Sequence, residues 1–580
     1  MLWSICSCGF MLLTLLQSSE QSCSDGTPRQ CAEAEMAPGA NLAGEGFDIT
    51  TMERKGAFVL EMNKWKRKDK TCTLCVNPFM ENKMQKLPLM AEDWRPKQSC
   101  SNTVTSKLYR SSESLVASIS SSIENNWDTN INAGHGKHSA SLTLSGSHSK
   151  LADYSNQKTK NDKYSFVSQS MSCSYYSYRV SSFPSMHRDF KKATKQLPES
   201  YSPENKQQFY KLINIFGTHF ITKVKLGGAI NSVTSVQDCM ANLEGVSVND
   251  VQLCLGVEAS LNSVVEINSK YNHCKKQNDK TENKASFATR FTDRFTEIKG
   301  GHTTEPDILF ASEKNPGAYK EWLATVPQHP DIISYSLESL HELLPANSRA
   351  KENLHAAIKH YILERALFKN CSSKCQSGIK SDRRDPCVCQ CHNDPAVTPD
   401  CCPTKRGMAR VIITVQKGSG LWGDHTTATD GYVKVFFNNK QVGRTPVINN
   451  NNQPHWAMAF DIGTQDLTQG NKVKFEVWDE DNKWDDDFLG ACQQVLSDGV
   501  KEDLCNLNHG QMYFKLEVKC APALRGETCT EYEPVPMLPS LRATFVSRHS
   551  HRVPKALLLE MGVFVEEQKL WRNQSNHDKM

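Results

Sequence analysis

The chain has 580 residues, of which 38% are hydrophobic, and its formal net charge is +4. This length predicts three or four domains, and this hydrophobic content is sufficient for several packed cores. A net charge this small, without a clustered basic segment, excludes nucleic acid as an expected partner.

The N-terminus has the pattern of a secretory signal. Phe10 to Leu16 form a short apolar run, and small polar residues follow up to Cys23, although no lysine or arginine precedes the run. The run is too short to cross a bilayer, and no later stretch has the roughly 20 apolar residues of a transmembrane helix. We therefore expect residues 1–21 to be removed and the protein to be secreted as a soluble molecule.

Two segments of the first half alternate between apolar and polar residues, and neither has the period of a soluble helix face. The first lies within 127–150 and alternates weakly. The second has apolar residues at Val257, Ala259, Leu261, Val265 and Ile267. About ten alternating residues are typical of one transmembrane β-strand, apolar toward lipid and polar toward a lumen. An ordinary strand or an amphipathic surface helix is the alternative.

A longer motif, FGTHFITKVKLGG, lies between these segments, and Ser202 to Glu204 are suited to cap a helix before it. It resembles the signature of the membrane-attack-complex/perforin (MACPF) family. The matching residues are Phe216, Gly217, Thr218, His219, Phe220, Gly227 and Gly228. Glycine pairs at 227–228 and 300–301 suit places where a strand bends or backbones approach closely. Because no nucleophile motif lies nearby, we expect His219 to be structural rather than catalytic.

Seven of the 22 cysteines are crowded between Cys371 and Cys402. Cys6 and Cys8 would leave with the signal, and the remaining 20 suit a disulfide framework in an oxidising compartment. A zinc module is the alternative for the crowded segment, although C-x-C-x-C spacing fits poorly around one tetrahedral ion. The segment resembles an EGF-like module, which disulfides hold together in place of a core. One of the seven should pair outside the module, and Cys239 is the expected partner.

The last third of the chain predicts an antiparallel β-sandwich. Apolar residues alternate in Arg410 to Val415 and in Lys472 to Trp478, and Tyr432 to Phe437 is rich in β-branched and aromatic residues. Two acidic clusters accompany these strands: Asp424 and Asp430, then Asp479, Asp481, Asp485, Asp486 and Asp487. Hard oxygen donors at mixed spacings suit Ca²⁺. For the triplet that ends at Asp487, taken alone, a solvated acidic turn is the alternative.

Three stretches of this region, GDHTTATDGYVKVFF, NNNNQPHW and VWDEDNKWDDDFLG, resemble the C2 family, in which Ca²⁺ bridges loop carboxylates to a phospholipid headgroup. The resemblance implies all seven aspartates as ligands, with weaker candidates in the backbone oxygens of Gly423, Thr427 and Ala428. Trp422 and Trp484 flank the loops. We expect both to anchor at the membrane surface, where indole rings settle.

Signal, signature, EGF-like cysteines and C2 loops occur in the order of the MACPF/perforin family, which the chain resembles over nearly its whole length. The resemblance implies a multidomain α+β protein. Its parts are a MACPF domain at 22–368 (a bent antiparallel sheet with flanking helical clusters), an EGF-like module at 369–407, a C2 domain at 408–520 and a C-terminal tail at 521–580.

The same resemblance implies a non-enzymatic, Ca²⁺-dependent cytolytic effector. Its C2 domain would dock on the phospholipid membrane of a target cell, and monomers would form a ring-shaped homo-oligomer. Helical clusters within Ser111 to Tyr178 and Asn249 to Phe295 would become transmembrane β-hairpins of a large aqueous pore. The resemblance further implies secretion, storage in cytolytic granules, and insertion into plasma or endosomal membranes. Granzyme-type proteases delivered through the pore would be further partners.

Disulfide pairing is also taken from the resemblance. The implied pairs are Cys23 with Cys75, Cys31 with Cys72, Cys100 with Cys173, Cys239 with Cys402, Cys254 with Cys274, Cys371 with Cys387, Cys375 with Cys389, Cys391 with Cys401, Cys492 with Cys505, and Cys520 with Cys529. Asn370 and Asn573 lie in glycosylation sequons. The tail from Arg548 is longer than the family leads us to expect, and its apolar pattern predicts a helix.

Two other functions are open. A non-lytic, secreted, Ca²⁺-dependent membrane-binding member of the family would keep the C2 loops but lack competent hairpins. A secreted lipid hydrolase would also use Ca²⁺ and membranes, but the chain contains neither a GxSxG elbow nor an HExxH motif.

Overall fold

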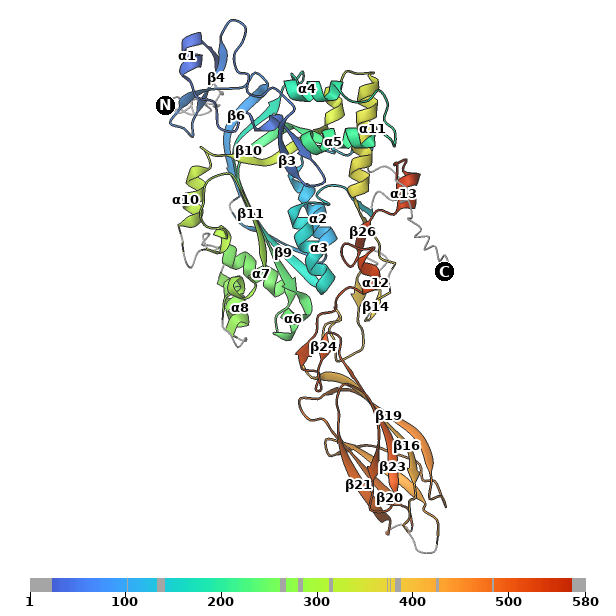
Figure 1. Cartoon of the computed structure of the whole chain (residues 1–580). Coiled ribbons are helices and arrows are strands. Elements are labelled where there is room, and N and C mark those ends of the chain that lie inside the picture. The colour runs from blue at the N-terminus through green and yellow to red at the C-terminus, as the bar shows by residue number, and fades with distance from the viewer. Residues whose placement is uncertain are drawn as a thin grey trace, which may run out of the picture.

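The computed structural model describes residues 23–565, apart from 102, 133–140, 261–267, 280–284, 312–314, 316, 373, 376, 381–386, 424–426 and 482–484. Two large hydrophobic cores organise these residues, one in the N-terminal domain and one in the C-terminal β-sandwich. Figure 1 shows the large sheet and the β-sandwich at opposite ends of an elongated molecule.

The N-terminal domain is built on a bent antiparallel sheet around two long strands, β9 (Tyr164–Val180) and β10 (His219–Gln237), which pair along most of their length. Each changes its outer partner midway. β10 pairs first with β2 and β12 and then with β11, and β9 pairs with β7 and then with β6. The bounds of the outer strands are β2 (Glu45–Asp48), β3 (Glu53–Phe58), β6 (Ala91–Cys100), β7 (Thr105–Tyr109), β11 (Arg294–Lys299) and β12 (Asp331–Ser339).

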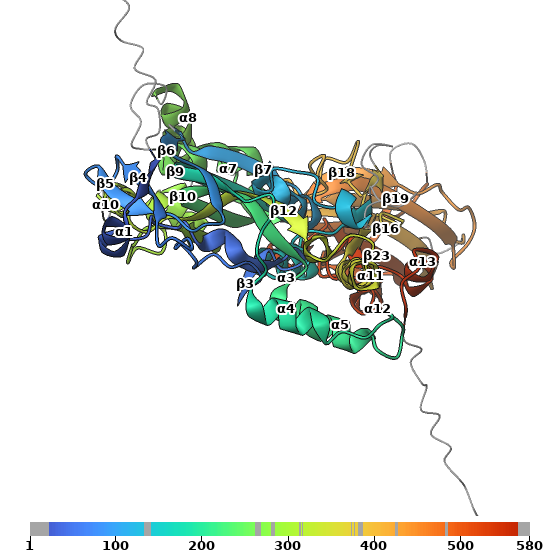
Figure 2. The same ribbon diagram turned by 90° about the horizontal axis from the view of Figure 1, so that it is seen from above.

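Helices flank this sheet on both sides. In Figure 2, α8 lies on one side of β9 and β10, and α4 and α5 lie on the other. Before the C-terminal tail, the described α-helices outside 110–163 and 238–293 are α1 (Pro28–Glu33), α4 (Arg188–Lys195), α5 (Lys206–Phe216), α10 (Ala318–Thr325) and α11 (Arg349–Arg365). The predicted cap at Ser202 is wrong, because α5 begins at Lys206 and Asn205 instead accepts a hydrogen bond from the Ser202 N–H at 2.9 Å.

Both hairpin connections of the half-sheet β7-β9-β10-β11 are helical. The first, between β7 and β9, contains α2 (Ser112–Ser118), β8 (Leu142–Thr143) and α3 (Lys150–Asn161); the second, between β10 and β11, contains α6 (Asp238–Leu243), α7 (Val248–Ala259), α8 (Asn268–Asp279) and α9 (Phe287–Arg290). The first expected range, Ser111 to Tyr178, contains α2 and α3 and also most of β9. The second helical segment starts at Asp238, before the expected Asn249.

The prediction that the segment from Val257 lacks a helical period is wrong for its described part. Val257 and Ala259 are buried in the last turn of α7. The helical stripe starts upstream, at Val248, Val251 and Leu255, and faces a small core of its own, so a window that opens at Val257 misses it. Leu261, Val265 and Ile267 lie outside the described residues.

The C-terminal domain is a sandwich of two four-stranded sheets, with orders β19-β16-β23-β22 and β18-β17-β20-β21. The three predicted strands are confirmed as parts of β16, β17 and β20. The bounds are β16 (Met408–Ser419), β17 (Gly431–Phe437), β18 (Lys440–Arg444), β19 (His455–Asp466), β20 (Lys472–Asp479), β21 (Asp487–Val495), β22 (Gly499–Asn506) and β23 (Gln511–Cys520). Alternate residues such as Val411, Ile413 and Phe475 fill the core between the sheets.

Ten disulfides link the same pairs that the family resemblance implies. All seven cysteines between Cys371 and Cys402 are bonded in this way, so none offers zinc a thiolate. Cys239 at the start of α6 is bonded to Cys402, which ties the N-terminal domain to the cysteine-rich module. The short strands are β1 (Cys23–Gly26), β4 (Cys72–Asn77), β5 (Lys83–Lys86), β13 (Leu367–Lys369), β14 (Ile379–Lys380), β15 (Cys389–Gln390), β24 (Leu524–Arg525) and β25 (Glu531–Tyr532).

The C-terminal tail runs back along the N-terminal domain, in red in Figure 1. It contains α12 (Pro539–Arg542), β26 (Ser550–Arg552) and α13 (Lys555–Glu560). Strand β26 pairs with β13, which also pairs with β8, and Val553, Leu557 and Val563 enter the large core. The predicted tail helix is confirmed over α13, and Asn573 lies outside the described residues.

Candidate functional site

The acidic loops of the β-sandwich meet at one end of a sheet because of strand register. Asp479, the last residue of β20, lies opposite Gly431 on β17 and opposite Asp487 on β21. Asp430, which precedes Gly431, therefore lies beside Asp479, and Asp487 lies on the other side of Asp479, at the edge where all three strands begin or end. Asp424 is outside the described residues.

The carboxylate of Asp479 is the buried centre of this group, with 2% of the residue exposed. It accepts a hydrogen bond from the Asp430 N–H at 2.6 Å, and Asp430 in turn accepts one from the Asn450 N–H at 2.6 Å. A β carbon added to Gly423 would lie 2.0 Å from Asp479 Oδ2, so the glycine backbone rests against this carboxylate. A buried carboxylate against a second aspartate and a close backbone supplies hard oxygen atoms of the kind that Ca²⁺ binds.

The other predicted ligands lie in the loops around this group. Asp481, Asp485 and Thr427 are exposed, and Ala428 is half-buried. Asp486 differs, because its carboxylate accepts a hydrogen bond from the Tyr432 hydroxyl at 2.6 Å. Burial and this carboxylate raise the pKa of Tyr432. Asp486 is therefore already held by a phenol and is the weaker candidate of its triplet.

One predicted membrane anchor is exposed at these loops. Trp422 is 45% exposed and stacks on His509 with ring centroids 4.1 Å apart, whereas Trp484 lies outside the described residues. Phe488, directly after the acidic triplet, is also 45% exposed and was missed by sequence reasoning. The sequence does contain a signal for Phe488, because it is an aromatic residue directly beside a predicted metal-binding loop. Trp456 is a core residue, buried with its indole N–H donating to the Gly431 carbonyl at 3.2 Å.

The signature motif forms the turn between α5 and β10. Phe216 ends the helix, and Gly217 follows with φ of 84°. A β carbon on Gly217 would lie 2.5 Å from the Phe47 carbonyl oxygen, so only glycine lets this turn approach β2. The Thr218 hydroxyl accepts from the Ile49 N–H at 3.0 Å and donates to the Phe47 carbonyl at 3.2 Å. The motif thus fixes the sheet to its covering helix.

His219 is fully buried, and the Trp127 ring meets its imidazole edge-on at 5.2 Å, while the next residue, Phe220, enters the large core. Its Nδ1 lies 2.8 Å from the Thr218 hydroxyl. Burial, with a smaller contribution from His341, lowers the pKa of His219 to about 3. The imidazole is therefore neutral at physiological pH and has the surroundings of a packing residue.

Acid should lower the free energy of unfolding, because His219 does not bind a proton while it is buried. Below about pH 6.5 the unfolded chain binds a proton that buried His219 does not, which costs about 2 kcal/mol of unfolding free energy by pH 5. We expect His219→Gln to unfold at a lower temperature than the wild type at pH 7, but to lose less between pH 7 and pH 5. Thermal unfolding at both pH values measures this. An equal loss in the two proteins would contradict it.

The two glycine pairs meet where β10 exchanges β12 for β11. A β carbon on Gly228 would lie 2.6 Å from the Trp322 ring, and one on Gly300 would lie 2.2 Å from the Gly227 carbonyl oxygen. Gly300 and Gly301 have φ of 67° and 65°, and the Trp322 indole N–H donates to the Gly300 carbonyl at 2.9 Å. These contacts hold the sheet at the point where it bends.

Helix α7 covers the outer edge of β7. The Ser106 hydroxyl donates to the Gln252 carbonyl at 3.1 Å, and the Gln252 side chain donates to the Ser106 carbonyl at 3.2 Å. Among the described strands, none pairs with this edge or with the outer edge of β11. Helix α7 thus shields the β7 edge of the half-sheet, which would otherwise offer unpaired backbone groups.

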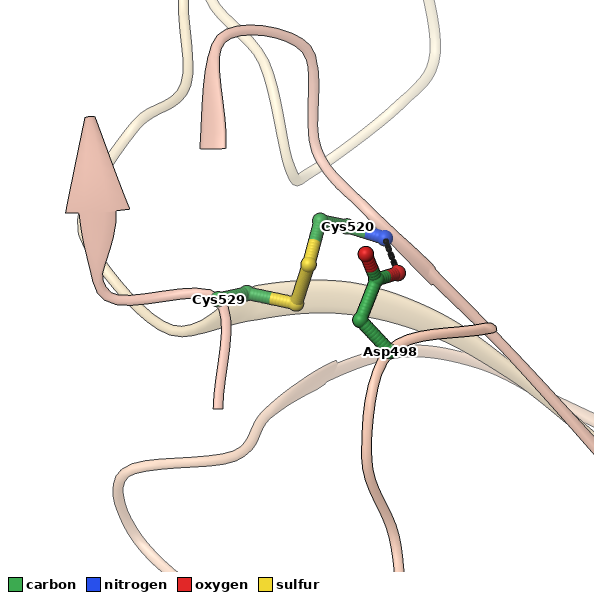
Figure 3. Close-up of side chains that lie close together, drawn as sticks. All are labelled: Asp498, Cys520 and Cys529. Carbon is green, nitrogen blue, oxygen red and sulfur yellow. Dashed lines mark hydrogen bonds between the residues drawn. A yellow bond between two sulfur atoms is a disulfide. The ribbon is translucent and has the colours of Figure 1, made fainter. Parts of the chain in front are cut away.

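Among the residues that the structure describes, one group of three possible metal ligands comes together, Asp498 with Cys520 and Cys529, but the two sulfurs are bonded to each other (Figure 3). Asp498 instead accepts a hydrogen bond from the Cys520 N–H at 3.3 Å. Over the same described residues, no helix combines the length and the apolar character required to cross a membrane.

Comparison with known proteins gives three family matches: the MAC/Perforin domain at residues 36–370, the perforin-1-like EGF domain at 370–404 and the C2 domain at 409–512. The chain is 37% identical to perforin-1 of Mus musculus over 541 residues, which cover 92% of this chain and 98% of that protein. It is also 37% identical to perforin-1 of Homo sapiens over 536 residues, covering 91% and 96% of the two chains. The complement component C8 alpha chain of Oryctolagus cuniculus is 22% identical over 407 residues, with coverage of 64% and 68%.

Proposed function

The chain belongs to the MACPF/perforin family, and on this premise we propose that it is a Ca²⁺-dependent, pore-forming cytolytic effector without enzymatic activity. One observation carries the proposal. In the half-sheet β7-β9-β10-β11, both hairpins are interrupted by helical segments, at 110–163 and 238–293. Helices that leave and re-enter adjacent antiparallel strands can extend those strands without any change of topology.

Extension of the hairpins supports a mechanism in which no apolar helix is required. Each converted segment would add two long strands, whose alternate side chains face lipid and lumen. The outer edges of β7 and β11 would then pair with neighbouring subunits, because a membrane-spanning sheet must close on itself to satisfy its backbone groups. A ring-shaped homo-oligomer follows from this requirement.

Docking is assigned to the C2 loops. Asp430, Asp479 and Asp487 would hold Ca²⁺, which would supply positive charge for a phospholipid headgroup, while Trp422 and Phe488 would enter the membrane surface.

We further propose secretion, storage in cytolytic granules and delivery of granzyme-type proteases through pores in plasma or endosomal membranes. The second candidate is a non-lytic Ca²⁺-dependent membrane-binding protein. The C2 loops by themselves support this candidate, because it requires docking but no extension of the hairpins.

Release of a trapped dye from phospholipid liposomes tests the proposal. We expect release with Ca²⁺ and none with EGTA, with all phospholipid headgroups intact afterwards by mass spectrometry. Binding without release would favour the non-lytic function. Hydrolysed lipid would instead identify an enzyme.

Asp430→Ala should impair docking to liposomes without disturbing the fold. Loss of one ligand is expected to raise the Ca²⁺ concentration for half-maximal liposome binding by roughly tenfold or more, since affinity follows ligand charge. Asp461→Ala is the matched control, because Asp461 lies in the same domain but on β19 of the other sheet, where it pairs with Arg410 of β16. Cosedimentation with liposomes measures binding. Normal binding by Asp430→Ala, or retained wild-type binding in EGTA, would contradict the assignment.

A further inference from the structure

Strands β10 and β11 have a regular register. Their partners run from Ala229 with Lys299 to Thr234 with Arg294, without a bulge, and in every pair the two residue numbers add up to 528. If both strands continued into the helical segment without a bulge, each later pair would keep this total. The register of the folded sheet therefore predicts which residues would face one another in the extended hairpin.

The disulfide between α7 and α8 obeys the same rule. Cys254 lies 20 residues after Thr234, and Cys274 lies 20 residues before Arg294, so their numbers also add up to 528. The two cysteines would thus be direct partners in the extended hairpin. In antiparallel pairs the α carbons are about 4.5 or 5.5 Å apart, which a disulfide spans, and in the helical form they are 5.5 Å apart.

On the α7 side of the disulfide, polar and apolar side chains separate by face in this register. Even-numbered positions carry Gln252, Cys254, Gly256, Glu258 and Ser260, whereas odd-numbered positions carry Val251, Leu253, Leu255, Val257 and Ala259. Direct partners of the even positions are also polar, and Glu258 would face Lys270. The α8 side is more mixed, because the partners of the odd positions are Gln277, Lys275, His273, Tyr271 and Ser269. The disulfide would therefore lie on the polar, lumen-facing side of the hairpin.

We infer that the Cys254–Cys274 disulfide stays closed when α7 and α8 convert, and that it becomes a cross-strand bridge that fixes the register of the inserted hairpin. This inference rests on the proposed function. Ten residues separate each cysteine from the centre of the register, about the length of one membrane-crossing strand. The bridge would then lie at the membrane surface nearer to the folded domain, with one crossing beyond it.

A bridge in this position has a mechanical consequence. A slip of one residue would turn every apolar side chain of the strand toward water. The disulfide prevents that slip, because a one-residue shift would put the two cysteines on opposite faces. The disulfide does not hinder the unfolding of α7 and α8, because the two bonded cysteines can move together while the helices convert into strands.

Cysteine cross-linking in pores tests the register. Asn249→Cys with Asp279→Cys is an in-register pair by the same total, and Asn249→Cys with Gln277→Cys is the control, shifted by two residues. Asn249 and Asp279 are exposed, and Gln277 is half-buried, so the folded monomer should tolerate both pairs. Each variant is assembled on liposomes with Ca²⁺, freed of unbound monomer, oxidised with copper phenanthroline and mapped by non-reducing proteolysis. Wild-type pores are mapped after thiol blocking.

We expect the in-register pair to cross-link at least several-fold more in pores than in solution and several-fold more than the shifted pair. Cys254 and Cys274 should remain bonded in wild-type pores. Three results would overturn the inference if the wild type still releases dye. These are equal cross-linking of the two pairs, an equal yield of cross-link in solution and in pores, and blocked thiols at either native cysteine. Absence of dye release from the wild type would overturn the proposed function, and this inference with it.

Discussion

Tyr271→Arg is expected to bind liposomes with Ca²⁺ as the wild type does, but to release no dye. Tyr271 lies on α8 and is 46% exposed, so an arginine should not disturb the folded monomer. In the extended hairpin it would face Val257 on the lipid side. Tyr271 would lie three residues from the bridge, between the membrane surface and the midplane, so a charge there costs an amount between the about 0–1 kcal/mol of an interface and the roughly 2–4 kcal/mol of the midplane. Repeated in every subunit of a ring, such a penalty should prevent insertion.

Asn272→Arg is the matched control, because the neighbouring position is also exposed on α8 but would face the lumen. It should keep most of its dye release. Flotation with liposomes confirms that both variants bind, and calcein release measures the pore. If the two variants release dye equally, this segment does not line a barrel, and the non-lytic function becomes the better one.

The β-sandwich was predictable because each of its sheets has one buried face. Val411, Ile413 and Val415 all point into the core, so the two-residue period of the strand is visible in the sequence. The acidic loops follow at the strand ends. The neighbours of each aspartate were not predictable, since the bond between Asp486 and Tyr432 depends on how two separate strands align.

Helix α7 was not predictable because its sequence fits two structures. Val248, Val251 and Leu255 form a helical stripe, whereas Val251, Leu255 and Val257 also fit the alternation of a strand. Contacts with Phe287 and other residues of a small separate core stabilise the helix in this state. A segment that must adopt both conformations carries both patterns, so periodicity alone cannot select one.

The contact between α7 and β7 allows an engineered disulfide to hold the protein in its helical form. A β carbon added to Gly256 would lie 3.1 Å from the β carbon of Ser106, close to the roughly 3.5–4.5 Å that separates the β carbons of a disulfide. We expect Ser106→Cys with Gly256→Cys to form a bond after a small shift of α7. This variant should bind liposomes with Ca²⁺ and release almost no dye until a reductant is added.

The physical reason is that β7 and α7 belong to different hairpins and must separate before either can extend. Extension moves α7 by tens of ångströms, which a covalent bond of about 2 Å does not permit. Ser106→Cys with Gly256→Ser is the matched control, because it crowds the same contact without a bond, and the wild type treated with the same reductant is the reference. Dye release by the oxidised double-cysteine variant, with the bond verified by non-reducing mapping, would show that α7 stays on β7 and that pores form by another route.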